Sequence, residues 1–333
     1  MTPNRTRNVV TLRDIAEACH VSINTVSHAL SDKADISEET KRRIRKKAKE
    51  LGYIRNRTAT SLRFQSTHTV TLIVSDISNP LFAIMAKKIE QRLSQEGYAL
   101  FIMNTESNAE AEYAAVVSAI ENAADGIIIC PNQEDTRAME LMQKRQVPFV
   151  LLGRRFIDSD MDYVIWNDRQ GGHQATNHLV GKGHRRILFV GEAPHISSTN
   201  ERLEGYRLAL EEHGLPFDPS LVYTKGVAKE KLEAMLRTQL NQPDPFTAIF
   251  AFSDFVACDL LAILYKLNPH HRIEVVGFDD IMTNIAFPLN ISSVHTPKAA
   301  MAAALVDSLL DKIRNGDEAN PCRIVIDTTL TVR

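Results

Sequence analysis

The stretch at positions 11–30, TLRDIAEACHVSINTVSHAL, decides the fold of the first part of this chain. Apolar residues recur at helical spacing on both sides of a break of three or four residues, so the stretch predicts two short amphipathic helices. Thr11 stands three residues before Asp14, which is a capping-box-like start, and Ser22 can cap the second helix. Two helices joined by so short a turn predict a helix-turn-helix, whose second helix fits the major groove of DNA.

A third helix is predicted to begin after Ser37 and to end before Gly52. On the second helix, Ile23, Asn24, Ser27 and His28 are left facing outward. This outward set is mostly small, polar and able to form hydrogen bonds, as contact with base edges requires. The inner stripes of the three helices are predicted to be Ile15, Ala16 and Cys19, then Val26, Ala29 and Leu30, then Ile44, Ala48 and Leu51.

The charge of the chain is divided unevenly between its two parts. Residues 1–65 hold 14 Lys and Arg against 7 Asp and Glu, whereas the remainder holds 25 against 34. A basic arm on an acidic body is typical of a DNA-reading domain attached to something else. A helix bundle without a nucleic-acid role is the alternative, in which the basic residues of the third helix form a solvated face. Those residues are Lys41, Arg42, Arg43, Arg45, Lys46 and Lys47.

The motifs and their spacing resemble the lactose-repressor/galactose-repressor family of bacterial transcription regulators. They occur in order as TLRDIA at 11–16, VSINTVS at 21–27, SEET at 37–40 and ELGY at 50–53, followed by NRTATSLR at 56–63. The last of these resembles the hinge helix of the family. The rest of the chain also follows the family pattern, so the resemblance covers nearly all 333 residues.

The resemblance implies how the headpiece contacts double-stranded operator DNA. Ile23 and Asn24 fall where the family reads bases, while Thr25 and Ser27 serve mainly phosphates. His28 takes a position that is usually Arg; because His offers at most one contact to guanine, we expect a divergent operator. His20 also departs from a turn position that is often Gly. The expected DNA-binding residues of the headpiece are Thr11, Leu12, Ser22, Ile23, Asn24, Thr25, Ser27 and His28.

The segment at 56–63 has two interpretations. Eight residues cannot sustain an isolated helix in water, so one interpretation is a plain flexible linker. The other, implied by the family, is a helix that forms only on DNA. In that helix Leu62 wedges between base steps in the minor groove, Ala59 allows close approach, and Asn56 also contacts DNA.

The body alternates strands and helices. Buried strands are predicted at 70–75, 99–103, 126–130, 148–152, 186–190, 247–251 and 273–278, and helices at 81–95, 109–122, 135–145, 170–180, 198–213 and 255–267. This order predicts parallel, doubly wound sheets in two α/β lobes. The resemblance implies a core like periplasmic sugar-binding proteins, in which the chain crosses between lobes several times. The predicted domains are a headpiece at 1–55, a hinge and linker at 56–68, and an effector-binding and dimerisation core at 69–333.

Polar residues follow several predicted strands, where ligands bind in open parallel sheets. Asn79 and Arg154 lie there by position, and the resemblance assigns Arg202, Asp279 and the pair Ser253 and Asp254 to effector contact. Taken singly, Asp254 could be an N-cap, and Asn79 with Pro80 a helix start. Phe82 and Trp166 are the candidate stacking residues for a sugar ring.

Four departures from the family leave the effector open. Gly153 stands where the family commonly has an acid, and Ser253 where it often has Asn. The pair Asn167 and Asp168 reverses a frequent Asp-Asn order, and the pair Thr296 and Pro297 replaces a common Gln-centred pair. The alternatives are a different sugar, a phosphorylated sugar held by Arg154 or Arg155, and a non-sugar effector. The effector either releases or promotes DNA binding.

Several other signals are absent from the sequence. No stretch reaches the roughly 18 apolar residues of a membrane span, and the start lacks a signal-peptide core, so a cytoplasmic protein is expected. The four cysteines are separated singletons, and no cofactor loop, metal motif or catalytic triad is present. We therefore expect no cofactor, no metal and no enzymatic activity.

The sequence predicts a ligand-responsive transcription regulator, most readily a repressor, that binds a near-palindromic operator as a homodimer. The end of the chain has no apolar heptad tail, which argues against a tetramer formed by a coiled coil. Two rivals remain: a solute-binding protein, and a doubly wound enzyme with an accessory DNA-binding domain. The first leaves the basic headpiece unexplained, and the second requires a cofactor loop.

Overall fold

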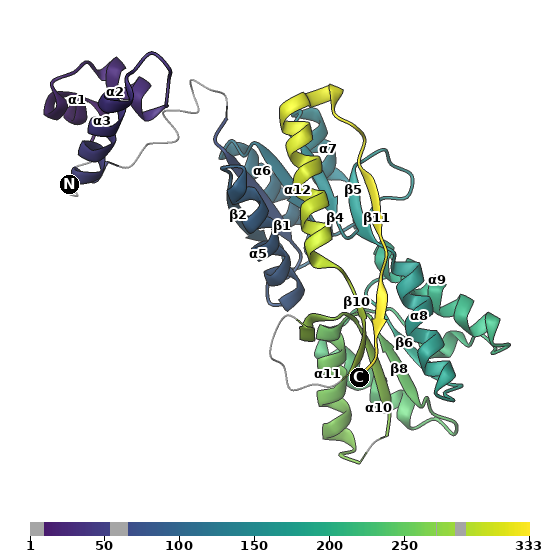
Figure 1. Cartoon of the computed structure of the whole chain (residues 1–333). Coiled ribbons are helices and arrows are strands. Elements are labelled where there is room, and N and C mark those ends of the chain that lie inside the picture. Colours follow the sequence, from purple (N-terminus) through teal and green to yellow (C-terminus); the bar gives the residue numbers. More distant parts are fainter. Residues whose placement is uncertain (1–9, 54–65, 271, 284–290) are drawn as a thin grey trace, which may run out of the picture. The chain divides into compact units, whose positions relative to one another are not determined.

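The computed structural model describes residues 10–53, 66–270, 272–283 and 291–333. The chain divides into two compact units at positions 65 and 66, which we call the headpiece and the core (Figure 1). Each unit is described by itself. The functional boundaries expected near residues 55 and 68 stay predictions.

The described part of the headpiece, residues 10–53, contains three helices, α1 (Leu12–Cys19), α2 (Ile23–Leu30) and α3 (Glu38–Glu50). A turn of three residues joins the first two, and its first residue, His20, has a left-handed backbone with φ 51°. This is the conformation that favours glycine, and a His adopts it with a steric penalty. The predicted helix-turn-helix is therefore formed, including its strained turn.

Short-range caps set the three helix starts. At α1 the backbone N–H of Thr11 donates to Asp14 Oδ2 (2.7 Å) and that of Asp14 donates to Thr11 Oγ1 (3.4 Å), which completes the capping box. Ser22 Oγ accepts from the Thr25 N–H at 3.0 Å, and Ser37 Oγ accepts in the same way at α3. All three caps were predicted from the sequence and are confirmed.

The headpiece core follows the predicted stripes with one correction. Ile15, Val26 and Ile44 are fully buried. Leu51, expected in the inner stripe, is 36% exposed because it is the C-cap of α3 and the chain turns away at Gly52. Tyr53 packs against the core instead, and its N–H donates to the carbonyl of Ala48.

The first lobe of the core is a six-stranded parallel sheet with helices on both faces. Its strand order is β11-β5-β4-β3-β1-β2. The strands are β1 (Thr69–Val74), β2 (Ala99–Asn104), β3 (Gly126–Ile129), β4 (Phe149–Leu152), β5 (Tyr163–Trp166) and β11 (Arg323–Ile326). The helices are α5 (Pro80–Gln95), α6 (Ala109–Glu121), α7 (Arg137–Lys144) and α12 (Lys298–Asn315).

The second lobe repeats this architecture with strand order β12-β10-β9-β8-β6-β7. Strand β12 runs antiparallel to β10, while the other described strand pairs of this sheet are parallel, as predicted. The strands are β6 (Ile187–Val190), β7 (Val222–Tyr223), β8 (Ala248–Ala251), β9 (Glu274–Asp279), β10 (Ser292–His295) and β12 (Thr329–Thr331). The helices are α8 (Asp168–Gly181), α9 (Ser197–Glu212), α10 (Lys229–Leu240) and α11 (Asp254–Leu267). Three 3₁₀ turns occur at Pro219–Leu221, Ile281–Thr283 and Gly316–Glu318.

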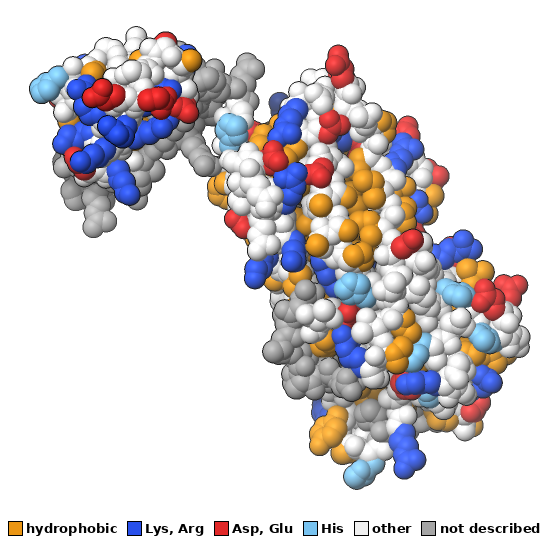
Figure 2. All heavy atoms as spheres, viewed as in Figure 1, with side chains coloured by type: hydrophobic (Ala, Val, Ile, Leu, Met, Phe, Trp, Pro, Cys, Tyr) orange, Lys and Arg blue, Asp and Glu red, His pale blue; other side chains and the backbone are white. Residues whose placement is uncertain are grey.

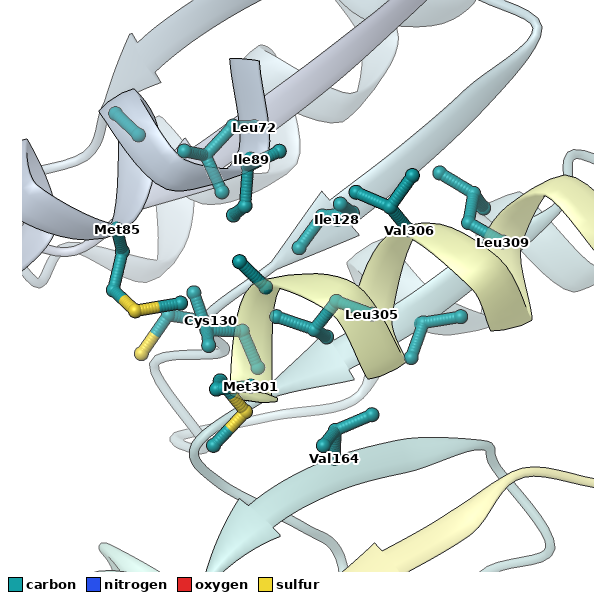
Figure 3. Packing of buried hydrophobic residues seen from close by; sticks show 14 of the residues in the cluster. Leu72, Met85, Ile89, Ile128, Cys130, Val164, Met301, Leu305, Val306 and Leu309 are labelled. Carbon is teal, nitrogen blue, oxygen red and sulfur yellow. The ribbon is translucent and has the colours of Figure 1, made fainter. Parts of the chain in front are cut away.

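The chain crosses between the lobes three times: after β5, after β10, and between β11 and β12 (Figure 1). Helix α12 therefore follows a second-lobe strand but packs on the first-lobe sheet. Its Met301, Leu305 and Val306 meet Leu72 and Ile128 of that sheet (Figure 3). Each such buried side chain contributes about 1.5–3 kcal/mol, so this returning helix holds the first lobe together.

Candidate DNA-binding and effector-binding sites

The outward face of α2 carries the residues predicted to read bases. Ile23 is 44% exposed and Asn24 is exposed, while Thr25 and Ser27 are partly exposed. An exposed isoleucine at the start of a capped helix is available for apolar contact with a base, such as a thymine methyl group. Thr11 and Leu12 lie at the start of α1, where the capping box holds the Thr11 hydroxyl against Asp14.

His28 is fixed by a neighbouring acid. Its Nδ1 lies 2.6 Å from Asp35 Oδ2, and its side chain is 26% exposed. Engagement of Nδ1 leaves Nε2 as the ring nitrogen for an outside partner. This geometry agrees with the expectation of at most one contact where the family usually has Arg.

The basic residues of α3 are less free than their sequence suggests. Lys41 is buried and contacts Asp32 and Glu38, and Arg45 also pairs with Asp32. Lys47 pairs with Glu50, and Arg43 donates to the carbonyl of Cys19. Figure 2 shows Lys and Arg side chains gathered over this helix. Of the six residues, Arg42, Arg43 and Lys46 are exposed and lack an ion pair within the described part of the headpiece, and only Arg42 and Lys46 of these also lack a side-chain hydrogen bond to that part.

The hinge residues Asn56, Ala59 and Leu62 lie outside the described residues, so their DNA contacts stay predictions. Among the helices that the structure describes, none combines the length and apolar character that a membrane crossing requires. The described ranges also bring together no group of three or more His, Cys, Asp or Glu able to hold a metal ion.

A cavity of about 160 Å³ lies in the core where strand ends of both sheets face each other. Seven of the eight predicted effector residues line it, and they come from both lobes. These are Asn79, Phe82, Arg154, Trp166, Arg202, Ser253 and Asp279. Further lining residues include Ser75, Asp76, Met85, Ser107, Cys130, Gly153, Glu192, Ser198, Val227, Phe252 and Phe255.

Arg202 forms the buried centre of the second-lobe side. Its guanidinium carbon lies 4.3 Å from the ring centre of Phe252 and 3.6 Å from that of Phe278. Its Nε donates to Asp168 Oδ1 at 2.8 Å, and Nη1 donates to the carbonyl of Phe252. Burial raises the pKa of Asp168 to about 7, although Arg202 opposes this shift.

Two glycines bring Arg202 and Asp168 together. A Cβ on Gly172 of α8 would lie 2.3 Å from the carbonyl oxygen of Arg202, and one on Gly205 of α9 would lie 2.1 Å from that of Arg169. The backbones of α8 and α9 therefore approach more closely than they could if Gly172 or Gly205 carried a side chain. This close crossing places the first residue of α8 beside the guanidinium on α9.

Asp279 presents an unused acceptor to the cavity. Its Oδ1 is buried and has no hydrogen-bond partner among the described residues. Burial raises the pKa of this carboxyl group. Asp279 and Asp280 both have positive φ, 94° and 51°, and their side chains diverge. Asp280 instead binds His295 Nδ1 and the Arg333 guanidinium, which agrees with the prediction that neighbouring acids at a strand end point in different directions.

Trp166 explains a departure from the family. Gly153 has φ 68°, and the Trp166 ring lies 3.3 Å from where a Cβ of residue 153 would be. Any side chain at 153 would press on this ring and, at this positive φ, would strain the backbone. Trp166 Nε1 is buried without a partner among the described residues, so it offers a donor beside the cavity.

Helix starts supply two more lining residues. Asn79 Oδ1 accepts from the Leu81 N–H (3.0 Å), which confirms the helix-start interpretation, and Ser253 Oγ caps α11 at the Val256 N–H (3.2 Å). Ser253, rather than Asp254, is thus the N-cap of α11.

Asp254 departs from the expected site, because it is absent from the cavity lining. Its carboxylate accepts from Ser293 Oγ (2.6 Å) and from the Ile281 N–H (2.8 Å). Gly277 makes room for it, since a Cβ there would lie 2.0 Å from Asp254 Oδ1. The carboxylate therefore holds β9 and the following turn in place instead of facing a ligand.

Sequence reasoning missed Asp168 and Glu192. Glu192 follows β6 directly, so the strand-end rule that identified Arg154 and Asp279 applies to it equally. For Asp168 the sequence shows only a family order reversed with Asn167, because its pairing with Arg202 depends on the crossing of α8 and α9.

Comparison with known proteins gives two family matches. Residues 11–56 match the bacterial regulatory proteins of the lacI family, and residues 67–331 match the periplasmic binding proteins and sugar binding domain of the LacI family. The second match alone spans well over half of the chain.

Relatives match over nearly the full length. The HTH-type transcriptional repressor PurR of Aliivibrio salmonicida is 27% identical over 310 residues, covering 92% of this chain and 93% of that protein. The HTH-type transcriptional regulator DegA of Bacillus subtilis is 31% identical over 303 residues, covering 88% of each. A solved complex of the transcriptional regulator CelR with cellobiose has a TM-score of 0.71 and 28% identity, covering 97% of this chain and 99% of that one.

These matches, the capped helix-turn-helix and the two-lobed core with its cavity agree with one another. The chain belongs to the LacI family of bacterial regulatory proteins, and it is a DNA-binding transcription regulator with a small-molecule effector domain rather than an enzyme.

Proposed function

We propose that this chain is a cytoplasmic repressor whose affinity for a near-palindromic operator is set by a sugar or sugar-like effector in the core cavity. The observation that carries the effector assignment is the pair of unused polar atoms at the cavity, Asp279 Oδ1 and Trp166 Nε1. A buried acceptor and a buried donor each lose free energy when unpaired, and a ligand bearing hydroxyl groups satisfies both. Phe82 and Trp166 add apolar faces for the C–H surface of a sugar ring.

The matching relatives support this assignment. The CelR structure is named as a complex with cellobiose, and PurR is named as a repressor. We propose Asn79, Phe82, Arg154, Trp166, Arg202, Ser253 and Asp279 as the residues that surround the effector. Asp254 acts behind them by positioning the turn that carries Asp279.

We propose a homodimer, because two identical reading helices match a palindromic site. The first-lobe edge strand β2 supports self-association. Its Phe101 is 57% exposed and Ile102 is 47% exposed. An apolar strand edge left open to solvent favours pairing with another chain.

The DNA-binding proposal is tested by selecting fragments of the source genome on the full chain and titrating the enriched sequence against salt. Asn24→Ala should weaken binding to the selected sequence by about 1–3 kcal/mol and leave binding to unrelated DNA nearly unchanged. Lys46→Ala is the matched control. It should weaken binding to all DNA sequences alike, and it should reduce the slope of the logarithm of the binding constant against the logarithm of the salt concentration by about 1. Failure to enrich any sequence, or equal losses on all DNA in the Asn24 variant, would contradict base reading by α2.

For the hinge, Leu62→Ala should weaken operator binding while the core still dimerises. Unchanged operator affinity would reject the minor-groove wedge and leave the flexible-linker interpretation. Dimerisation is read by sedimentation on the same samples.

A further inference from the structure

The charges around the cavity are unusual for a site that would hold an anion. Arg154 and Arg202 are the cations among its described lining residues, and each is already paired with a carboxylate at 2.8 Å. Asp76 and Asp279 add two more acids to the lining. Lys298 lies behind Asp279 and donates to the backbone carbonyls of Asp279 and Asp280. The lining therefore presents no unpaired guanidinium to a ligand.

Arg154 is held in place from two sides. It is buried, its Nη1 donates to the carbonyl of Pro131 (2.9 Å), and its Nη2 donates to Glu192 Oε2 (2.8 Å). Arg154 follows β4 of the first lobe and Glu192 follows β6 of the second, and both line the cavity. The pair thus joins the two lobes at the ligand site, and Glu192 covers the guanidinium edge that an oxyanion would use.

The neighbouring pair offers a natural control. Arg155 donates through Nε to Glu201 Oε1 at 3.0 Å, which also joins the two lobes. Arg155 and Glu201 are absent from the cavity lining, and the guanidinium of Arg155 lies over the Tyr163 ring. Releasing Arg155 therefore changes an interlobe ion pair without changing the cavity charge.

We propose that Glu192 is a specificity-determining residue: by neutralising Arg154 it restricts the cavity to uncharged polar ligands and rejects phosphorylated or carboxylated ones. This inference rests on the proposed function in taking the cavity as the effector site. An anion could reach Arg154 only by displacing Glu192, which would leave a carboxylate unpaired in a partly buried position beside Asp279. Rejection by an unpaired charge is an effective means of discrimination between otherwise similar ligands.

The test uses inorganic phosphate as the probe and the full chain as the protein. Glu192→Gln keeps the shape of the side chain, removes its charge and leaves Arg154 without a carboxylate partner. Phosphate binding is followed by thermal denaturation and by the emission of Trp166, the sole tryptophan of the chain, at constant ionic strength maintained with chloride. We expect negligible binding to the natural chain and a gain of roughly ten-fold or more in Glu192→Gln.

Three further variants decide the interpretation. Glu201→Gln should bind phosphate no better than the natural chain, and Glu192→Gln combined with Arg154→Gln should lose the gain. Glu192→Ala frees the same guanidinium and should repeat the gain if Glu192→Gln folds poorly. Phosphate binding by the natural chain as tight as by Glu192→Gln would overturn the proposal, as would the absence of a gain in both Glu192 variants. These phosphate-binding measurements use neither DNA nor effector. Their outcome is therefore independent of the operator selection that tests the proposed function.

Discussion

The headpiece and the cavity use their cationic side chains in opposite ways. On α3, Arg42 and Lys46 are exposed, whereas Arg154 and Arg202 of the cavity are buried and paired. Exposed cations attract any DNA through its phosphates and carry no sequence information. Buried, paired cations instead keep the polar groups around them in fixed positions, and their burial costs desolvation free energy. We therefore propose that other groups supply selectivity in both regions: Ile23 and Asn24 in the headpiece, and the unused polar atoms of Asp279 and Trp166 in the core.

The largest effect that this contrast predicts comes from breaking a buried pair. Asp168→Ala leaves the Arg202 guanidinium buried without its carboxylate and should destabilise the core by about 3–5 kcal/mol. Asp160→Ala removes the exposed partner of Arg323 and should change the stability of the core far less. Urea unfolding followed by Trp166 emission measures both, since this tryptophan reports on the core alone. Similar losses in the two variants would contradict the contrast.

A second variant tests the crossing that supports that pair. Gly172→Ala places a methyl group against the backbone carbonyl of Arg202 and should cost about 1–3 kcal/mol. Gly181→Ala, at the other end of α8, meets no atom within 4 Å and serves as the control. The Trp166 unfolding transition should move to lower urea for Gly172→Ala only; a shift of the same size in the control would show that general helix effects dominate.

The core should also respond to pH through buried acids, unlike the exposed charges of the headpiece. Burial raises the pKa of Glu112 to about 7, above its ordinary 4.5. The folded core therefore binds this proton more tightly than the unfolded chain. The contribution of Glu112 to stability is fully present below pH 4.5 and is lost as the pH rises from there through 7. Between pH 6 and 8 the natural chain should lose about 1–2 kcal/mol more than Glu112→Gln. If the free energy of unfolding changed equally with pH in the two proteins, this role of Glu112 would be ruled out.

The smallest effect is expected from a headpiece cap. Ser22→Ala removes the oxygen that accepts from the Thr25 N–H and should destabilise the headpiece by about 1 kcal/mol. Helix content of the headpiece and operator affinity should fall, while the Trp166 transition stays in place. Movement of that transition would mean that the headpiece and the core unfold as one unit.

Local features of the fold were predictable and long-range ones were not. The caps at Thr11, Ser22 and Ser37 involve partners three residues away, so the sequence shows both ends of each bond. Strand β5 has four residues and no flanking periodicity, and the elements after β9 were not predicted either. The return of α12 to the first lobe depends on a crossover that no local pattern records.

The candidate cavity shows the same division. Strand-end position and family resemblance placed seven residues at the cavity. They failed for Asp254, because the close approach at Gly277 turns its carboxylate inward, and for Asp168, because its role arises from a helix crossing. Glu192 was within reach of the strand-end rule and was overlooked. Packing between distant backbones, rather than residue type, decides the positions of Asp254 and Asp168.

The central claim is that a ligand in this cavity controls the headpiece. It is tested by titrating a sugar or polyol found by thermal-shift screening into the chain on its selected operator, while Trp166 emission and operator affinity are recorded together. Both signals should change over the same concentration range, and Asp279→Asn should shift both ranges together. A ligand that alters operator affinity with no change at Trp166, or an Asp279 variant that shifts one signal alone, would contradict it.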